Sequence, residues 1–305
     1  MTCNAQFEGV FCPSITITNA DGTIDYDNWG KHLDHLIDAG IDGVLLFGSI
    51  GEFYAIDVKT KAEAVRFAVS KVAGRMKVLV GVGDTNLDNV RTLAAESETA
   101  GADALVAVSP YYFGPSPDCA KRYFSAVAKA TTLPVILYNF PARTGNDLTP
   151  ELVADLAAEN QNIIGIKDEA GVNPTQVTDF LLATRDVNPE FVVFNGDDIM
   201  LLPTIIQGAM GIVTGGAHIF GKEIREIFKA FEEGRNEDAK NSFEPLYRFC
   251  KSCGQNGRIL PNSILRPAVE KVSGVKIGPS RRPLAPATEE ELEVTLGILK
   301  EIGKL

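Results

Sequence analysis

Eight short, apolar, β-branched segments recur along this chain, and amphipathic stretches separate them. The segments are almost continuously apolar and do not alternate with polar residues, which is typical of parallel strands covered by helices. Their starts fall roughly 20 to 35 residues apart, which is enough for one strand and one crossover helix. The sequence therefore predicts eight strands, at 11–17, 42–48, 77–83, 104–110, 134–140, 163–169, 191–197 and 211–216.

The stretches between these strands have the spacing of helices. Trp29, Leu33 and Leu36 recur at helical intervals, and Thr149 followed by Pro150 is typical of a helix start. Eight strand–helix units favour an α/β fold, the closed (β/α)8 TIM barrel, over the alternative of an open, doubly wound sheet. We expect the barrel to occupy residues 1–235 and to carry the active site.

Residues 236–305 are predicted to form a C-terminal helical extension, because only helical patterns follow the eighth strand. A last barrel helix is expected at 222–233, and helices of the extension at 243–253 and 263–272. Thr288 and Glu291 have the spacing of a capping box, which predicts the start of a third helix there.

Composition excludes several classes of function. The 305 residues carry a net charge of −11. Nucleic acids and anionic membranes are themselves negatively charged and bind surfaces on which Lys and Arg cluster, so neither is an expected partner. No apolar stretch reaches the roughly 18 residues of a membrane span, and the first residues lack the pattern of a secretory signal. Five scattered cysteines are typical of reduced thiols, so we expect a cytoplasmic protein with no nucleic-acid or membrane partner.

The metal-binding residue types are sparse. A catalytic three-histidine site would need all of His32, His35 and His218, and the first two lie on a predicted surface helix. Cys250 and Cys253 form a C-x-x-C pair, but no second pair and no nearby histidine accompany them. The sequence therefore predicts no metal site.

The candidate nucleophile is Lys167, which follows the apolar run 163–166 in the sixth predicted strand. Active sites of β/α barrels form at the carboxyl ends of the strands. Burial lowers the pKa of a lysine, and a neutral amine attacks ketones to form imines. The alternatives are that Lys167 pairs with Asp168 or reaches solvent at the barrel rim.

Two hydroxyl groups accompany this lysine at neighbouring strand ends. Tyr138 lies near the end of the fifth strand, within reach of Lys167 because adjacent strands are about 4.8 Å apart. A phenol there suits proton transfer, although a tyrosine that caps the core is the alternative. Ser49 lies between Gly48 and Gly51 in a turn toward a helix, where free amides bind carboxylates.

With these residues in view, the chain resembles the dihydrodipicolinate synthase and N-acetylneuraminate lyase family of class I aldolases over nearly its whole length. The most specific motifs are Gly-Ser-x-Gly-Glu at 48–52, Ser-Pro-Tyr-Tyr at 109–112, the stretch 133–145 with Tyr-Asn-Phe-Pro, and Ile-Ile-Gly-Ile-Lys-Asp at 163–168.

The resemblance implies that Lys167 forms a Schiff base with pyruvate and that Tyr138 is the general acid/base. It implies that Ser49 belongs to a proton relay and that Tyr112 reaches into the neighbouring subunit's site. No metal or organic cofactor is implied, because the iminium is the electron sink. The assembly it implies is a homotetramer, built as a dimer of dimers.

The predicted substrate contacts lie around these groups. The backbone at Ile50 and Gly51 is expected to hold the 2-oxo acid carboxylate, and Arg143 matches the position where synthase members hold a carboxylate. Glu169 is expected to accept hydrogen bonds from sugar hydroxyls, or to pair with Arg143, or to face solvent at the rim. The remaining predicted contacts, at the ends of the seventh and eighth strands, are Gly196, Asp197 with Asp198, and Val213.

Two residues depart from the family pattern. Ile50 replaces a second hydroxyl residue, and Glu169 stands where synthases tend to have Ala and lyases Thr. Together with the sequence of residues 48–53, these departures favour a reaction that cleaves a 2-keto-3-deoxy sugar acid to pyruvate and an aldehyde, or forms it from them. Arg143 instead favours condensation of pyruvate with aspartate semialdehyde. An imine-forming dehydratase and a non-catalytic 2-oxo acid binding protein are further alternatives.

Overall fold

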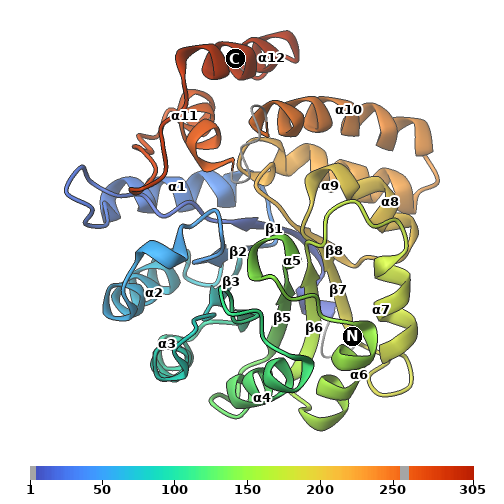
Figure 1. Cartoon of the computed structure of the whole chain (residues 1–305). Helices are drawn as coiled ribbons and strands as arrows, with labels where there is room; N and C mark the ends of the chain where they lie inside the picture. The colour runs from blue at the N-terminus through green and yellow to red at the C-terminus, as the bar shows by residue number, and fades with distance from the viewer. Residues whose placement is uncertain (1–4, 255–260) are drawn as a thin grey trace.

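The computed structural model describes residues 5–254 and 261–305, and its eight strands form a closed parallel barrel in sequence order (Figure 1). Pairing of β1 with β8, Gly9 opposite Gly211, closes the sheet and rules out the open alternative. The predicted TIM barrel is confirmed. The strands are β1 (Gly9–Pro13), β2 (Gly43–Leu46), β3 (Lys77–Gly81), β4 (Ala104–Val108), β5 (Val135–Asn139), β6 (Ile163–Asp168), β7 (Val192–Asn195) and β8 (Gly211–Val213).

Every strand ends earlier than predicted. β5 and β6 end one residue early, whereas β2 stops at Leu46 and β7 at Asn195, each two residues early. After these strands the backbone leaves the sheet and forms the loops that carry Ser49 and Asp197. An apolar run continues into such a loop when the loop is itself buried, so hydrophobicity alone overstates the strand.

Helices surround the strands, as Figure 1 shows. Their starts carry local caps: the Thr149 hydroxyl accepts from the Leu152 amide at 3.3 Å, as predicted. The helices up to β8 are α1 (Tyr26–Asp38), α2 (Val58–Val72), α3 (Leu87–Ala100), α4 (Pro117–Ala128), α5 (Pro141–Thr144), α6 (Pro150–Glu159), α7 (Gln176–Thr184) and α8 (Leu201–Ile206), with 3-10 turns η1 (Ala5–Phe7), η2 (Phe53–Ala55) and η3 (Asp198–Met200).

The helices after β8 are α9 (Ala217–Glu232), α10 (Asn236–Cys253), α11 (Asn262–Ser273) and α12 (Glu289–Glu301). α10 begins earlier than predicted, and the capping box of Thr288 and Glu291 is present at α12. In Figure 1, α10, α11 and α12 gather at one side of the barrel, in orange and red. In the described part of the chain, no helix has the length and apolar character needed to cross a membrane.

The barrel interior is filled by side chains of alternate strand residues. Phe11 and Phe194 meet edge to face with ring centroids 5.4 Å apart, and Leu45, Leu79 and Ile136 pack around them. A barrel of eight strands is just wide enough for side chains to fill it. The filled interior leaves the carboxyl ends of the strands as the place for polar groups.

The histidines are placed differently from the prediction. His32 is fully buried where α1 meets α9, and its ring stacks on that of His218 at 5.2 Å. The prediction of a surface position was wrong because α1 turns this side chain toward α9. Among the described residues, no group of His, Cys, Asp and Glu is arranged to hold a metal ion, and the described cysteines are free thiols. Cys3 lies outside the described residues.

Candidate active site

Lys167 lies on β6 with only 4% of its surface exposed, and its Nζ is 2.6 Å from Oε2 of Glu169. Residues two apart on a strand share one face, so both side chains point into the barrel. Asp168 points the other way and accepts hydrogen bonds from Asn139 and Gln176. The alternative pairing of Lys167 with Asp168 is therefore wrong, and Glu169 is the partner.

Tyr138 lies directly opposite Lys167 in the register between β5 and β6. The lysine amine lies 3.8 Å from the centre of the tyrosine ring, and the phenol donates to the same Oε2 of Glu169 at 2.5 Å. Ser49 Oγ is 3.5 Å from the phenol oxygen. Burial, followed by the charge of Glu169, holds the pKa of Tyr138 well above its usual value, so the phenol keeps its proton.

Ser49 and Ile50 belong to a sharp loop after β2. Phe47 and Glu52, at its two ends, have φ of 54° and 57°, in the left-handed region. A Cβ at Gly51 would lie 3.0 Å from the Ser14 carbonyl oxygen, so this position needs glycine. The amides of Ile50 and Gly51 donate to no other group among residues 5–254 and 261–305, and they remain available to an anion.

A cavity of about 80 Å³ opens where these groups meet. Most of the predicted site residues line it. Gly196 is one of them, and a Cβ there would lie 2.8 Å from Cβ of Glu169, so the glycine makes room for the carboxylate. The predicted residues that line the cavity are Ser49, Ile50, Tyr138, Lys167, Glu169, Gly196, Asp198 and Val213.

The remaining predicted residues, Gly51 and three side chains, lie outside the cavity lining. Arg143 lies on α5 with its guanidinium 5.2 Å from the Phe140 ring centre, near the charge of Glu169. Asp197 caps η3 by accepting from the Ile199 amide at 3.1 Å. Tyr112 is 98% exposed, with φ of 80°. The structure therefore brings together Lys167, Tyr138 and Ser49 but not these three side chains.

The chain matches the dihydrodipicolinate synthetase family over residues 6–302. The chain belongs to this family. It is 33% identical to the 4-hydroxy-tetrahydrodipicolinate synthase of Desulforamulus reducens, covering 98% of this chain and 99% of the relative. It is also 38% identical to the putative 2-dehydro-3-deoxy-D-gluconate aldolase YagE of Escherichia coli K12, covering 77% of each chain.

The solved structure of YagE in complex with pyruvate superposes with a TM-score of 0.92 at 31% identity, covering 98% of this chain and 99% of that chain. The relatives of this family member are named synthases and aldolases, so the chain is an enzyme of the lyase class. Because the relatives include both synthases and sugar-acid aldolases, the choice between the two activities has to be argued from the site residues.

The structure adds a contributor that the sequence did not indicate. Pro261 lines the cavity, and Asn262 hydrogen-bonds to the loop of Ser49 and Ile50. Both belong to the extension, more than 200 positions along the chain from that loop. No motif or spacing signals this contact, because it depends on how α11 packs against the barrel.

Proposed function

We propose that this family member is a pyruvate-dependent Schiff-base aldolase that cleaves or forms a 2-keto-3-deoxy sugar acid. The observation that carries the proposal is the convergence of Lys167 and Tyr138 on one oxygen of Glu169, inside a small cavity beside two available amides. YagE, whose structure contains pyruvate, and the probable 2-dehydro-3-deoxy-D-pentonate aldolase YjhH, at 38% identity, support it.

Imine formation begins with proton transfer from the Lys167 ammonium to Glu169, which is 2.6 Å away. The neutral amine then attacks the ketone carbon of the 2-oxo acid, whose carboxylate binds the amides of Ile50 and Gly51. Glu169 returns the proton to the carbinolamine hydroxyl, which leaves as water, so that a protonated imine forms and Glu169 is again a carboxylate. Because the iminium withdraws electrons from C3, this route uses no metal or organic cofactor.

Cleavage of the C3–C4 bond requires removal of the C4 hydroxyl proton. Tyr138 receives this proton while its own phenol proton passes to Glu169, so the phenol stays neutral overall. The electron pair of the broken bond forms the enamine of pyruvate, and C4 leaves as an aldehyde. Protonation at C3 and hydrolysis of the imine then release pyruvate. In synthesis the same steps run in reverse.

Glu169 favours a sugar acid over aspartate semialdehyde as the natural partner. A carboxylate beside the reacting carbons repels an acceptor that carries its own carboxylate, whereas sugar hydroxyls donate hydrogen bonds to it. The charge of Arg143 lies near Glu169 and is partly compensated by it. Condensation with aspartate semialdehyde, the activity of the synthases, is therefore the less favoured reaction.

A second candidate reaction is dehydration through the same imine, and the position of Glu169 favours it. As a carboxylate again after imine formation, Glu169 is placed to take a proton from C3 and, as the carboxylic acid, to give it to the leaving hydroxyl at C4. Loss of a C3 proton and of that hydroxyl releases water and keeps the carbon chain intact. Product analysis separates the two reactions, because only the aldolase releases pyruvate and an aldehyde.

The deciding experiment is pyruvate release from 2-keto-3-deoxygluconate and from its galactonate epimer, coupled to lactate dehydrogenase. We expect release with the wild type and none with Lys167→Ala. Retained turnover in Lys167→Ala would overturn the imine mechanism. A dehydrated 2-oxo acid without pyruvate would assign the dehydratase, and turnover of pyruvate only with aspartate semialdehyde would assign the synthase.

We also propose a homotetramer, built as a dimer of dimers, in which Tyr112 enters the site of a neighbouring subunit. Tyr112, in the loop after β4, is almost fully exposed, and Phe113 beside it is 55% exposed. An exposed pair of aromatic side chains is typical of a protein–protein contact. In this proposal the protein is cytoplasmic, residues 1–235 supply the catalytic side chains, and residues 236–305 form the extension.

A further inference from the structure

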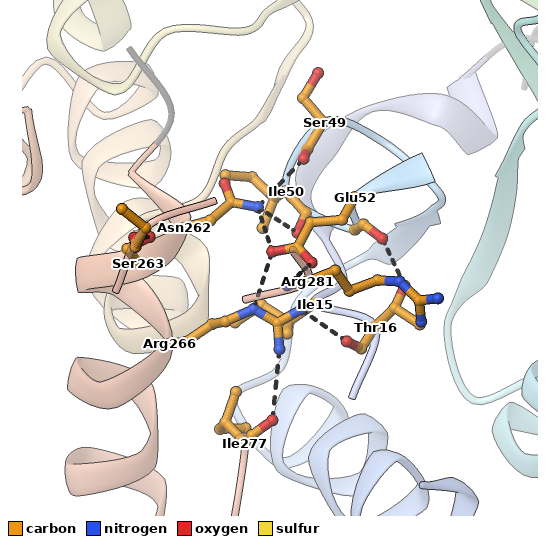
Figure 2. Close-up of polar contacts among 12 residues, drawn as sticks. Ile15, Thr16, Ser49, Ile50, Glu52, Asn262, Ser263, Arg266, Ile277 and Arg281 are labelled. Atoms are coloured by element: carbon orange, nitrogen blue, oxygen red, sulfur yellow. Dashed lines mark hydrogen bonds and ion pairs between the residues drawn. The ribbon is translucent and has the colours of Figure 1, made fainter. Parts of the chain in front are cut away.

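Glu52, which ends the loop of Ser49 and Ile50, is completely buried and joins the barrel to the extension (Figure 2). Its Oε1 accepts from Asn262 Nδ2 at 3.1 Å and from Arg266 Nε at 3.2 Å, and both donors lie on α11. Its Oε2 accepts from the Arg281 amide at 2.8 Å. All three donors belong to the extension, so among the described residues the carboxylate of Glu52 is bound by that part of the chain.

Asn262 also contacts the backbone that is proposed to bind the substrate. Its Nδ2 is 3.4 Å from the Ser49 carbonyl oxygen and 3.2 Å from that of Ile50. In a planar trans peptide the carbonyl and the next amide point in opposite directions. Holding the carbonyls of Ser49 and Ile50 toward α11 therefore turns the amides of Ile50 and Gly51 away from α11.

Arg266 fixes the other side of the same loop. Its Nη2 donates to the Thr16 carbonyl at 2.8 Å, and the Thr16 hydroxyl donates to the Gly51 carbonyl at 2.9 Å. Arg266 is 1% exposed, and such a buried ion pair stabilises a fold no better than well-packed apolar side chains do. Arg266 links the carboxylate of Glu52, whose φ of 57° lies in the left-handed region, to Thr16 and through Thr16 to Gly51.

We infer that Asn262 and Arg266, acting with Glu52, are positioning residues that aim the amides of Ile50 and Gly51 at the carboxylate of the 2-oxo acid. The inference rests on the proposed function, because it assumes that these amides bind that carboxylate. It assigns the extension a part in substrate binding, although every proposed catalytic side chain comes from the barrel.

The test measures covalent trapping of pyruvate by borohydride reduction, followed by intact mass, across a range of pyruvate concentrations. Asn262→Ala removes the donors to the loop, and Glu52→Gln removes the charge that Arg266 meets. Arg266→Lys keeps a cation for Glu52 but loses the planar fork that reaches Thr16. Ser263→Ala is the matched control, because its hydroxyl donates only to the Ala285 carbonyl, at 2.6 Å.

We expect Asn262→Ala to raise the half-saturating pyruvate concentration about tenfold, with full trapping at saturation, since a lost hydrogen bond of this kind is worth about one factor of ten. Glu52→Gln and Arg266→Lys should raise it by smaller factors, and Ser263→Ala should leave it unchanged. Circular dichroism and thermal melting establish that each variant is folded, and Glu52→Gln answers the question if Asn262→Ala does not fold.

The outcomes separate the inference from the proposed function. If the wild type is not trapped by pyruvate, the proposed function fails. The inference is overturned if the wild type is trapped and the folded variants show the same half-saturating pyruvate concentration as the wild type. A fall in melting temperature alone would then give Asn262, Arg266 and Glu52 a purely structural role. A parallel rise in Ser263→Ala would also overturn it, because the effect would then belong to α11 in general.

Discussion

Oε2 of Glu169 lies 2.6 Å from the amine of Lys167, and the same oxygen accepts a hydrogen bond from the phenol oxygen of Tyr138, which is 2.5 Å away. One carboxylate therefore serves both the proposed nucleophile and the proposed acid/base. The steps that remove a proton from Lys167 and from Tyr138 therefore both depend on Glu169. The consequences of this arrangement can be measured separately.

Glu169→Gln should lower turnover by about two to four orders of magnitude, the usual contribution of a positioned proton acceptor. The amide cannot take a proton from Lys167, so imine formation should also slow, while bound pyruvate is still trapped on long incubation. Stopped-time borohydride trapping measures this rate. Glu290→Gln, an exposed carboxylate in the first turn of α12, is the control. A trapping rate equal to that of the wild type would remove Glu169 from proton transfer.

Tyr138→Phe should slow aldol cleavage by a similar factor and still trap pyruvate, because the amine of Lys167 is intact. Its ring remains beneath the amine, so the change tests the hydroxyl alone. Turnover of the sugar acid and the extent of trapping are measured on the same preparation. Tyr247→Phe, a half-exposed position on α10, is the control. Unimpaired cleavage in Tyr138→Phe would assign the acid/base to another group.

Gly196→Ala should displace Glu169 and reduce turnover by at least about tenfold, because its Cβ would lie 2.8 Å from Cβ of Glu169. Overpacking of this kind also costs about 1–3 kcal/mol of unfolding free energy. Gly297→Ala on α12 is the matched control: no atom lies within 4 Å of its added Cβ, and it should stabilise the chain by about 0.5–1 kcal/mol. Normal activity in Gly196→Ala would show that Glu169 tolerates displacement.

Acid should weaken the fold through His218. Burial, reinforced by the charges of His35 and Arg266, lowers the pKa of His218 to about 4, and neutral His218 accepts from the Ile15 amide. A histidine whose pKa is lower in the folded state binds its proton mainly after unfolding, so stability falls as pH drops from about 6.5 to 4. The total loss from this one group is of order 3 kcal/mol.

Two buried carboxylates act in the opposite direction over the same range. Burial raises the pKa of Asp168 to about 7 and that of Asp198 to about 6, so their contribution to stability is lost as pH rises. The measurement is therefore a difference: thermal or urea unfolding of His218→Gln against wild type between pH 4 and 7. The difference in unfolding free energy between wild type and His218→Gln should shrink toward pH 4. A difference that stays constant would contradict the lowered pKa of His218.

Tyr112→Ala should lower turnover strongly although the side chain is 98% exposed in a single chain. The reason is the proposed insertion of this residue into a neighbouring site. Sedimentation velocity and activity are measured together. Phe113→Ala keeps the hydroxyl of Tyr112, so it shows whether loss of assembly alone lowers turnover. Full activity of Tyr112→Ala in a monomeric state would contradict both the proposed role and the proposed assembly.

The local patterns were sufficient for much of the fold. Parallel strands buried on both faces leave an almost continuous apolar signature, and helix caps such as Thr149 and Thr288 act within three residues. Where local signals were incomplete, the prediction failed: His32 lies on an amphipathic helix, but the packing of α9 buries it. Strand ends were overstated because a buried apolar residue such as Phe47 continues the run of β2 although its φ of 54° already belongs to the loop.

The barrel, the candidate nucleophile Lys167 and its neighbours on adjacent strand ends could be predicted from the residues alone, because they depend on periodicity and on which residue types suit the chemistry. The pairing of Lys167 with Glu169 and not with Asp168 became visible only in the folded chain, where the strand pleat sends neighbouring side chains to opposite faces of the barrel wall. Only the tertiary structure brought Asn262 and Arg266 to Glu52 across more than 200 residues. Such contacts depend on the packing of whole elements, which no local pattern of residues encodes.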